Sequence, residues 1–408
     1  MSIKTLTGAI VGIILGCFAG YLVFHELSTS TKPVVYTPVV QKPEQAPPPI
    51  HEEVVTTTAP ALPPNATAST THDGEGTHTE VITAPLELPT STISVTPTAA
   101  TNTQYVVLAF DGSRSLDMWK QTRALAQDLA RQGITLHFTY FINTVYLLAY
   151  QHRDFYHPPQ HATGTSPIGF ATTEKDVADR LEQMNAAMKE GHEIGSHAMG
   201  HYNGATWTEA EWLQEFQSFF DTIAQVATIN HLEKEPLNRQ KLVLPPEGMV
   251  GFRAPELGMN DHIWPVLKHF HFLYDTSFTS KPNVWPSKLK NGFWEFPLEK
   301  IAFNASTTSS LLSMDYNFYF KQSKAIDVAK KGTPLWDQYY NEVLTSYRQY
   351  FSQSYEGNRA PIFIGHHFSL WNDGVYWEAL KTFAQETCGK PNVQCVSYKE
   401  VMEALNAR

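Results

Sequence analysis

The hydrophobic and polar positions after residue 104 form a repeating pattern of short apolar runs and longer amphipathic segments. The first run, residues 105–110, is apolar throughout, which is typical of a buried strand. In residues 116–131 apolar side chains recur at helical spacing, and Gly133 provides a stop. Thr208 and Glu211 predict a capping box at the start of a later helix. The same pattern predicts strands at 134–142, 192–196, 250–253, 272–274, 293–296, 362–366 and 393–397, and helices at 174–190, 208–229, 260–270, 336–351, 375–387 and 399–406.

Repeated strand–helix units predict the α/β class, with a mainly parallel sheet whose strands are buried on both faces. Seven or eight units in a globular part of about 300 residues favour a closed (β/α) barrel over an open sheet. In such a barrel the chemistry lies at the carboxyl ends of the strands. We therefore look for polar residues that directly follow the predicted strands.

The chain before the barrel divides into two predicted parts. Residues 6–24 are uncharged and apolar or small, follow Lys4, and are long enough for a helix that spans a bilayer. We predict an uncleaved signal anchor over 1–27; a cleaved signal peptide or a lipoprotein signal at Cys17 are the alternatives. All three place the rest of the chain outside the cytoplasm. Residues 28–103 are rich in Thr and Pro, and we predict a disordered linker. The catalytic domain would then occupy 104–408.

Composition narrows the possible functions. A net charge of −10 with a pI near 5.9 argues against a nucleic-acid partner. The charged fraction of 17% is low, partly because the anchor and linker dilute an ordinary domain. Three cysteines exclude a disulfide scaffold. Cys388 and Cys395, outside the membrane, are predicted to form a local disulfide.

Two groups of polar residues follow the first and third predicted strands. Asp111, before Gly112, is suited to be a metal ligand or a general base, although Asp-Gly is also a common turn. His197 and His201 are four residues apart, so on a helical turn both imidazoles could reach one divalent ion. The alternative is a pair of surface histidines in a loop.

Two more groups follow later strands. Arg253, in Arg-Ala-Pro, can hold a carboxylate in a bidentate grip, or form a purely structural ion pair. His366 and His367 end another strand, and a histidine there can act as a general acid. Only one of two adjacent strand residues can point inward. Parity favours His366 if Ile362 and Ile364 face in.

The ordered set of acid, His-x-x-x-His, Arg-x-Pro and His resembles the polysaccharide deacetylases, the carbohydrate esterases with a NodB-homology domain. The resemblance covers residues 105 to 404 and is closest to the chitin-deacetylase branch found in arthropods. The features that carry the branch resemblance are Phe252-Arg253-Ala254-Pro255, Tyr274-Asp275-Thr276-Ser277, Trp294-Glu295-Phe296-Pro297 and Asn358-Arg359-Ala360-Pro361.

The resemblance implies a distorted NodB-type barrel and hydrolysis of N-acetyl groups on an N-acetylglucosamine-containing polysaccharide, with release of acetate. His197 and His201 would bind a divalent metal, with Zn²⁺ as the expected ion and Co²⁺ or Ni²⁺ as alternatives. Asp111 would be the general base, and His366 or His367 the general acid. Arg253 and Asp275 would orient these groups. Trp294, Trp371 and Trp377 are candidates for lining a sugar groove, with core packing favoured for Trp377.

The chain departs from the family pattern at three places. The second Asp of the family's Asp-Asp pair, a metal ligand, is Gly112. Either Asp111 itself binds the metal, or water or another group such as Asp117 takes the place. The Tyr that follows Pro in the family is Glu256 here. Finally, Leu-x-His spacing selects His366, whereas the arthropod-type pattern selects His367.

Two alternatives remain open beside the deacetylase. One is a catalytically impaired deacetylase-fold protein that binds carbohydrate, favoured by Gly112. The other is an amidohydrolase that acts on a non-glycan amide. The expected partners are an N-acetylated polysaccharide and a membrane reached through the N-terminal helix. The sequence leaves open whether the polymer is chitin-like, peptidoglycan or an exopolysaccharide, and it leaves the oligomeric state open.

Overall fold

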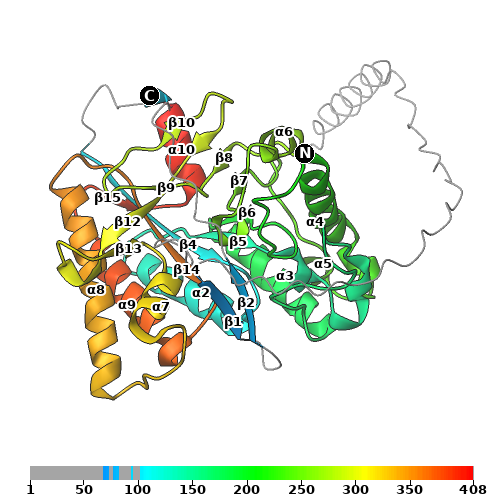
Figure 1. Cartoon of the computed structure of the whole chain (residues 1–408), viewed down its shortest axis with the longest axis horizontal. Helices are drawn as coiled ribbons and strands as arrows, with labels where there is room; N and C mark the ends of the chain where they lie inside the picture. The colour runs from blue at the N-terminus through cyan, green and yellow to red at the C-terminus, as the bar shows by residue number, and fades with distance from the viewer. Residues whose placement is uncertain (1–67, 73–76, 82–92, 95–101, 408) are drawn as a thin grey trace, which may run out of the picture. The chain divides into compact units, whose positions relative to one another are not determined.

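The computed structural model describes residues 68–72, 77–81, 93–94 and 102–407 (Figure 1). Contacts divide the chain into Met1–Ala61 and Leu62–Arg408, and all described residues belong to the second unit. The predicted anchor over 1–27 lies outside the described residues. Within the described part of the chain, no helix is long and apolar enough to span a bilayer.

A curled, mostly parallel sheet forms the centre of the unit (Figure 1). Its strands run in the order β14-β4-β5-β6-β7-β8-β11-β10-β3, and β15 also pairs with β4. The parallel strands are β4 (Gln104–Asp111), β5 (Thr139–Ile142), β6 (Glu193–Ser196), β7 (Gly251–Phe252), β8 (Tyr274–Asp275), β11 (Trp294–Glu295), β14 (Ile362–His367) and β15 (Val393–Cys395). The predicted α/β class with a parallel sheet is confirmed.

The sheet does not close into the full barrel that the sequence predicts. At one edge β10 (Ser287–Lys288) pairs antiparallel with β11 and with β3 (Ile93–Ser94). The chain that would complete the barrel instead forms a second sheet of β9 (Thr279–Ser280), β12 (Leu298–Ala302) and β13 (Ser310–Leu312). A single parallel bridge between Met314 and Gly365 links it to β14. The result is a curled half-barrel, in agreement with a distorted and incomplete barrel.

Helices cover the sheet between successive strands, and most were predicted to within a few residues. Thr208 caps α4 with the predicted capping box. The pattern missed the one-turn helix α5 and the helix that begins with a buried acid, α7. The helices are α2 (Leu116–Ala130), α3 (Glu174–Lys189), α4 (Glu209–Ile229), α5 (Leu237–Gln240), α6 (Ile263–His269), α7 (Asp315–Ser323), α8 (Pro334–Tyr355), α9 (Trp371–Thr387) and α10 (Tyr398–Asn406), with 3₁₀ turns η1 (Thr144–Leu147), η2 (Tyr150–Phe155), η3 (Pro255–Leu257) and η4 (Phe303–Ala305).

Both faces of β4 are buried, which explains its unbroken apolar run. Val106, Leu108 and Phe110 belong to the large core between the sheet and the outer helices. Val107 and Ala109 belong to a second core, to which α10 contributes its apolar side chains. Because successive side chains alternate between faces, Asp111 lies on the face that α10 covers.

The predicted disulfide is confirmed, because Cys388 and Cys395 are bonded with their Cα atoms 5.5 Å apart. Cys388 caps the end of α9, and Cys395 ends β15. The bond therefore joins the last outer helix to a strand that pairs with β4.

The prediction that 28–103 is wholly without regular structure is wrong at three short segments. β1 (Ala68–His72) and β2 (Thr77–Val81) form an antiparallel pair, and β3 adds to the edge of the main sheet. Threonine and valine recur in β1 and β2, and β-branched residues favour strands. The remainder of 28–101 lies outside the described residues.

Candidate functional site

A buried ion pair joins the end of β4 to the turn after β7. Arg253 Nη1 donates to Asp111 Oδ1 over 2.7 Å, and both side chains are almost fully buried. Arg253 Nη2 also donates to the hydroxyl of Tyr398 over 2.9 Å, and the guanidinium lies over the Phe141 ring. Burial alone would lower the pKa of Arg253, but the charge of Asp111 raises it, so the arginine stays cationic.

His197 and His201 lie in the loop after β6, and not on a helical turn as predicted. The loop turns sharply, since Ala198 and His201 have φ of 54° and 61°. The two imidazole rings nevertheless meet edge to face, with centroids 5.0 Å apart. The two side chains therefore lie next to each other, although the backbone conformation differs from the helical turn that was expected.

Hydrogen bonding and burial leave the two imidazoles in a form that can bind a metal. His197 Nδ1 donates to the carbonyl of Arg253 over 2.8 Å, which leaves Nε2 as the lone-pair nitrogen of the neutral ring. His201 Nδ1 is buried and has no hydrogen-bond partner among the described residues. Burial lowers the pKa of His197 to about 4 and holds that of His201 well below its usual value. Both rings are therefore neutral at pH 7, the form that binds metal ions.

A buried carboxylate on α4 holds this loop in place, and the sequence analysis missed it. Glu215 Oε1 accepts from the backbone N–H groups of Met199 and Gly200, each over 2.9 Å. Its Oε2 accepts from the Tyr156 hydroxyl over 2.7 Å. The only available signal is a charged residue at an apolar position of an amphipathic helix.

The two adjacent histidines of β14 lie on opposite faces of the sheet. His366 is paired in register with Phe110 and lies in the outer core, where Nε2 is 2.9 Å from the Tyr347 hydroxyl. His367 is paired in register with Asp111, so the two share the face that α10 covers. The parity argument favoured His366 only if Ile362 and Ile364 face inward, and both instead belong to the outer core.

Asp315, the first residue of α7, orients His367. Its Oδ1 lies 2.6 Å from His367 Nδ1, and its Oδ2 accepts from the His367 backbone N–H over 2.9 Å. Burial alone would lower the pKa of His367, but the charge and hydrogen bond of Asp315 raise it. With a side chain 27% exposed, His367 combines a charged partner with access to solvent. An acid within the apolar run Leu311–Tyr316 was the signal for Asp315.

Asp275 acts on the turn that carries Arg253 and does not contact the arginine by a hydrogen bond. Its carboxylate accepts from the backbone N–H and the hydroxyl of Ser277, and the Ser277 Oγ accepts from the Ala254 N–H over 2.8 Å. Glu295 shares a hydrogen bond with Asp275, and burial with the charge of Asp275 raises the pKa of Glu295 well above its usual value. These contacts fit the predicted orienting role.

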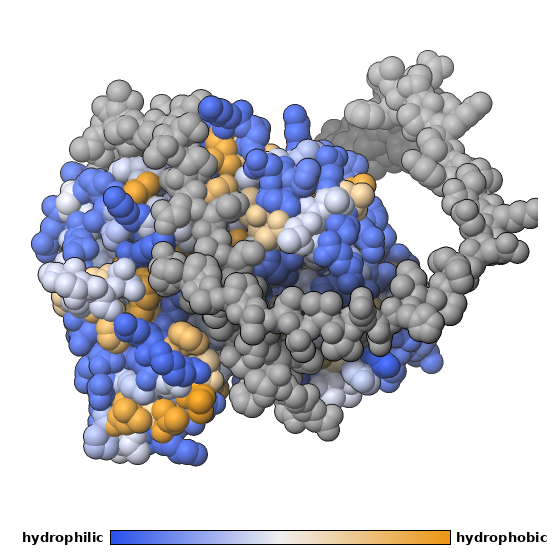
Figure 2. Space-filling view, viewed as in Figure 1, coloured by the Kyte–Doolittle hydropathy of each residue, from blue (hydrophilic) through white to orange (hydrophobic). Residues whose placement is uncertain are grey.

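Of the three tryptophans considered for a sugar groove, only Trp371 lies beside the site. Its ring is 5.3 Å from that of His367 and stacks on Tyr319. Trp294 and Trp377 are 3% exposed and belong to the core, as was favoured for Trp377, so a groove-lining role is wrong for Trp294. Figure 2 shows apolar surface over the lower ends of α7 and α8, where the connecting segment exposes Ile326 and Val328.

The neutral imidazoles of His197 and His201 supply two donors for a metal ion. In the part of the chain that the structure describes, the ligand atoms of Asp111, His197 and His201 do not all lie within 4.8 Å of one another. Asp117, considered as a replacement ligand, has a side chain that is 81% exposed and lies near Lys120. Gly112 has a φ of +83°, and a Cβ added there would meet no atom within 4 Å.

The similarity of this chain to known proteins lies at the level of solved structures. No family model and no curated protein matches the chain. Among solved structures, a Mycobacterium smegmatis protein assigned to the polysaccharide deacetylases is similar with 16% identity and a TM-score of 0.44, over 80% of this chain and 94% of that one. A Pseudomonas aeruginosa protein with the same assignment has 13% identity and a TM-score of 0.43, over 75% and 92%.

A third similar structure is a CE4 family pseudoenzyme from Bacillus anthracis, with 12% identity and a TM-score of 0.36, over 74% of this chain and 66% of that one. These similar structures and others with comparable scores are described as polysaccharide or peptidoglycan deacetylases and carbohydrate esterases of family 4, some of them pseudoenzymes. Because these TM-scores are below 0.5, the roles of the site residues are argued from the contacts of this chain alone.

Proposed function

We propose that this chain is a metal-dependent hydrolase that removes N-acetyl groups from an N-acetylglucosamine-containing polysaccharide and releases acetate. One observation carries the proposal: Asp111, His197 and His367 follow or end β4, β6 and β14, and each is held by a partner suited to acid–base or metal chemistry. Amide hydrolysis requires a general base, a group that activates the carbonyl and a general acid, and the Asp111 carboxylate, the neutral His197 imidazole and the His367 imidazole with its raised pKa match these three needs.

Each residue has a defined part in this proposal. A divalent cation held by His197 and His201 would polarise the acetyl carbonyl and acidify a water molecule. Asp111, paired with Arg253, accepts the proton of the attacking water. His367, whose pKa Asp315 raises, donates a proton to the amine nitrogen as the C–N bond breaks. Water adds to the acetyl carbon, so the products are acetate and the free amine.

The location of the enzyme is part of the same proposal. An N-terminal anchor over 1–27 would hold the catalytic domain outside the cytoplasm, on a tether made from 28–103. A tethered enzyme would act on polymer near its own envelope. Chitin-like polymers, peptidoglycan and exopolysaccharides all contain the required N-acetyl group.

A substrate panel tests this function. The full-length protein is assayed for acetate release from chitin oligomers, peptidoglycan fragments and an N-acetylglucosamine exopolysaccharide, with Zn²⁺, Co²⁺ or a chelator present. We expect release from at least one glycan, loss with the chelator, and loss in His197→Ala. Metal-loaded protein that releases acetate from none of these glycans overturns the proposal.

A second candidate, a carbohydrate-binding protein with impaired catalysis, is favoured by Gly112. Open space around Gly112 allows a carboxylate there, although its backbone conformation costs a non-glycine residue about 1–2 kcal/mol. If the missing ligand limits catalysis, Gly112→Asp tightens zinc binding about tenfold or more and raises acetate release. Gly112→Ala carries the same backbone cost without the ligand. Equal zinc affinity in both variants removes the support for this candidate.

A further inference from the structure

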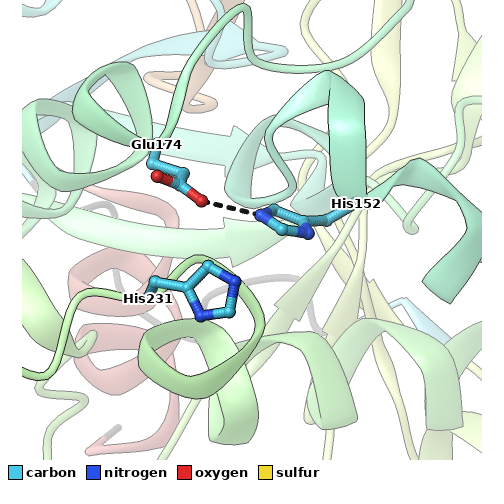
Figure 3. Close-up of side chains that lie close together, drawn as sticks. All are labelled: His152, Glu174 and His231. Carbon is cyan, nitrogen blue, oxygen red and sulfur yellow. Dashed lines mark hydrogen bonds and ion pairs between the residues drawn. The ribbon is translucent and has the colours of Figure 1, made fainter.

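A second group of metal-ligating side chains lies outside the site described above. His152 lies in η2, Glu174 is the first residue of α3, and His231 follows the end of α4 (Figure 3). One ligand atom from each residue lies within 4.8 Å of the other two. No other group of three such residues meets this distance in the described ranges.

The three side chains present the donors that a borderline divalent cation prefers. Figure 3 shows the Glu174 carboxylate directed at the His152 ring, with the His231 ring beside them. His152 Nε2 is 2.8 Å from Glu174 Oε1, and the two imidazole rings lie 5.2 Å apart and nearly perpendicular. Two imidazole nitrogens and one carboxylate oxygen are a common protein ligand set for Zn²⁺, with a fourth position left for water.

The backbone next to each ligand is held in place independently of the ligands. Asn230, fully buried beside His231, accepts from the Ala149 N–H over 2.8 Å and donates to the Leu147 carbonyl over 2.9 Å. Tyr150 N–H donates to the Ala171 carbonyl over 2.8 Å, which ties η2 to the segment before α3. The positions of the three ligands are therefore set before any cation binds.

The conformation of His231 is a second, independent observation. Its φ of 53° places it in the left-handed region directly after α4, where glycine is the usual residue and histidine carries a steric cost. In this conformation the His231 ring lies beside the His152 ring of η2 and the Glu174 carboxylate of α3. Uncommon backbone conformations of this kind are concentrated at functional positions.

We propose that His152, Glu174 and His231 form a second zinc site, separate from the His197–His201 pair. The site joins η2, α3 and the end of α4, three segments that are distant in sequence. Binding would stabilise the fold, because the three ligands come together only in the folded state, and the cation would bind that state and not the unfolded chain.

Zinc stoichiometry in the full-length protein tests the proposal. Equilibrium dialysis against Zn²⁺ is run for the wild type, His231→Ala and Glu174→Gln. We expect each variant to bind one Zn²⁺ fewer per chain, or to bind the second ion at least tenfold more weakly, as losing even an outer-shell partner costs about 10–100-fold. We also expect Zn²⁺ to raise the Tm of the wild type more than that of either variant.

His157→Ala is the matched control, because His157 is an exposed histidine close in sequence that lies outside the group. It should match the wild type in stoichiometry and in the Tm increase. Far-UV circular dichroism checks that every variant is folded.

Equal stoichiometry and equal affinity in the wild type and His231→Ala overturn the site. A lower metal-free Tm of Glu174→Gln with unchanged zinc binding also overturns it, and identifies a simple ion pair between His152 and Glu174. Acetate release is measured separately, and since the proposal does not rest on hydrolysis, failure of one leaves the other standing.

Discussion

Adjacent histidines acquire opposite properties at the end of β14. Burial lowers the pKa of His366 to about 4, whereas the charge of Asp315, which outweighs burial, raises the pKa of His367. His366 is therefore neutral and packed against Phe110, and His367 is the one that can carry a proton to a substrate. A shift of one position along the strand changes both the face and the charge state.

This difference predicts unequal effects of matching substitutions. His367→Gln should reduce kcat for acetate release by about 10²–10⁴-fold, the usual contribution of a general acid. His366→Gln should retain most activity, because its side chain lies in the outer core. Steady-state kinetics of the two variants on one chitin oligomer make the comparison. A larger loss of kcat in His366→Gln than in His367→Gln would contradict the assignment.

The pair of Asp315 and His367 also predicts a pH dependence. In the proposed mechanism His367 must be protonated, so activity is lost as pH rises through the pKa of that residue, which Asp315 raises. Asp315→Asn removes the charge and lowers this pKa, so the alkaline limb of the kcat profile should move to lower pH. The Asn oxygen can still accept from His367 Nδ1. An alkaline limb that stays in place would show that another group donates the proton.

At the scale of elements, each functional residue is placed by a turn after a strand or by the start of a helix. The loop 197–201 owes its shape to Glu215 on α4, and the orientation of His367 depends on Asp315 at the start of α7. The last strand, β15, is short and depends on neighbours to remain beside β4. The Cys388–Cys395 bond ties it to the end of α9.

Removing this bond should destabilise the fold without altering the chemistry. For a closed loop of eight residues, the chain-entropy model gives a loss of about 2.5 kcal/mol in the free energy of unfolding for Cys388→Ser with Cys395→Ser. Urea denaturation of oxidised wild type and of the double variant measures this difference. Wild type with reductant should match the variant. Equal midpoints for oxidised and reduced wild type would contradict the prediction.

At the scale of the whole molecule, burial on both faces of the sheet encloses several titratable groups. His192 accepts from the Phe138 N–H over 3.0 Å and is 5% exposed, and burial lowers its pKa to about 4. His366 is held neutral in the same way. Both side chains regain an ordinary pKa of about 6.5 when the chain unfolds.

The fold should therefore lose stability in acid. For a histidine with a lowered pKa in the folded state, stability is fully present above about pH 6.5 and decreases as pH falls towards 4. Each of the two should cost on the order of 3 kcal/mol at pH 4. Chemical denaturation from pH 7 to 4 measures the slope. His192→Gln should flatten it and exposed His157→Gln should not; equal slopes in the two variants would contradict the prediction.

The sequence by itself determined the α/β class, most helices and strands, and the local disulfide, and it singled out Asp111, His197, His201 and Arg253 as candidates. These follow from local periodicity, from spacing, and from the rule that chemistry lies at strand ends. Only the tertiary structure placed His367, and not His366, on the same face as Asp111, since both faces of β14 are apolar and parity alone gives no direction. It alone also supplied Asp315, Glu215 and the group around His231, because partners distant in sequence leave no periodic pattern. Likewise the half-barrel follows from the pairing of β12 with β9, a long-range contact that no local window contains.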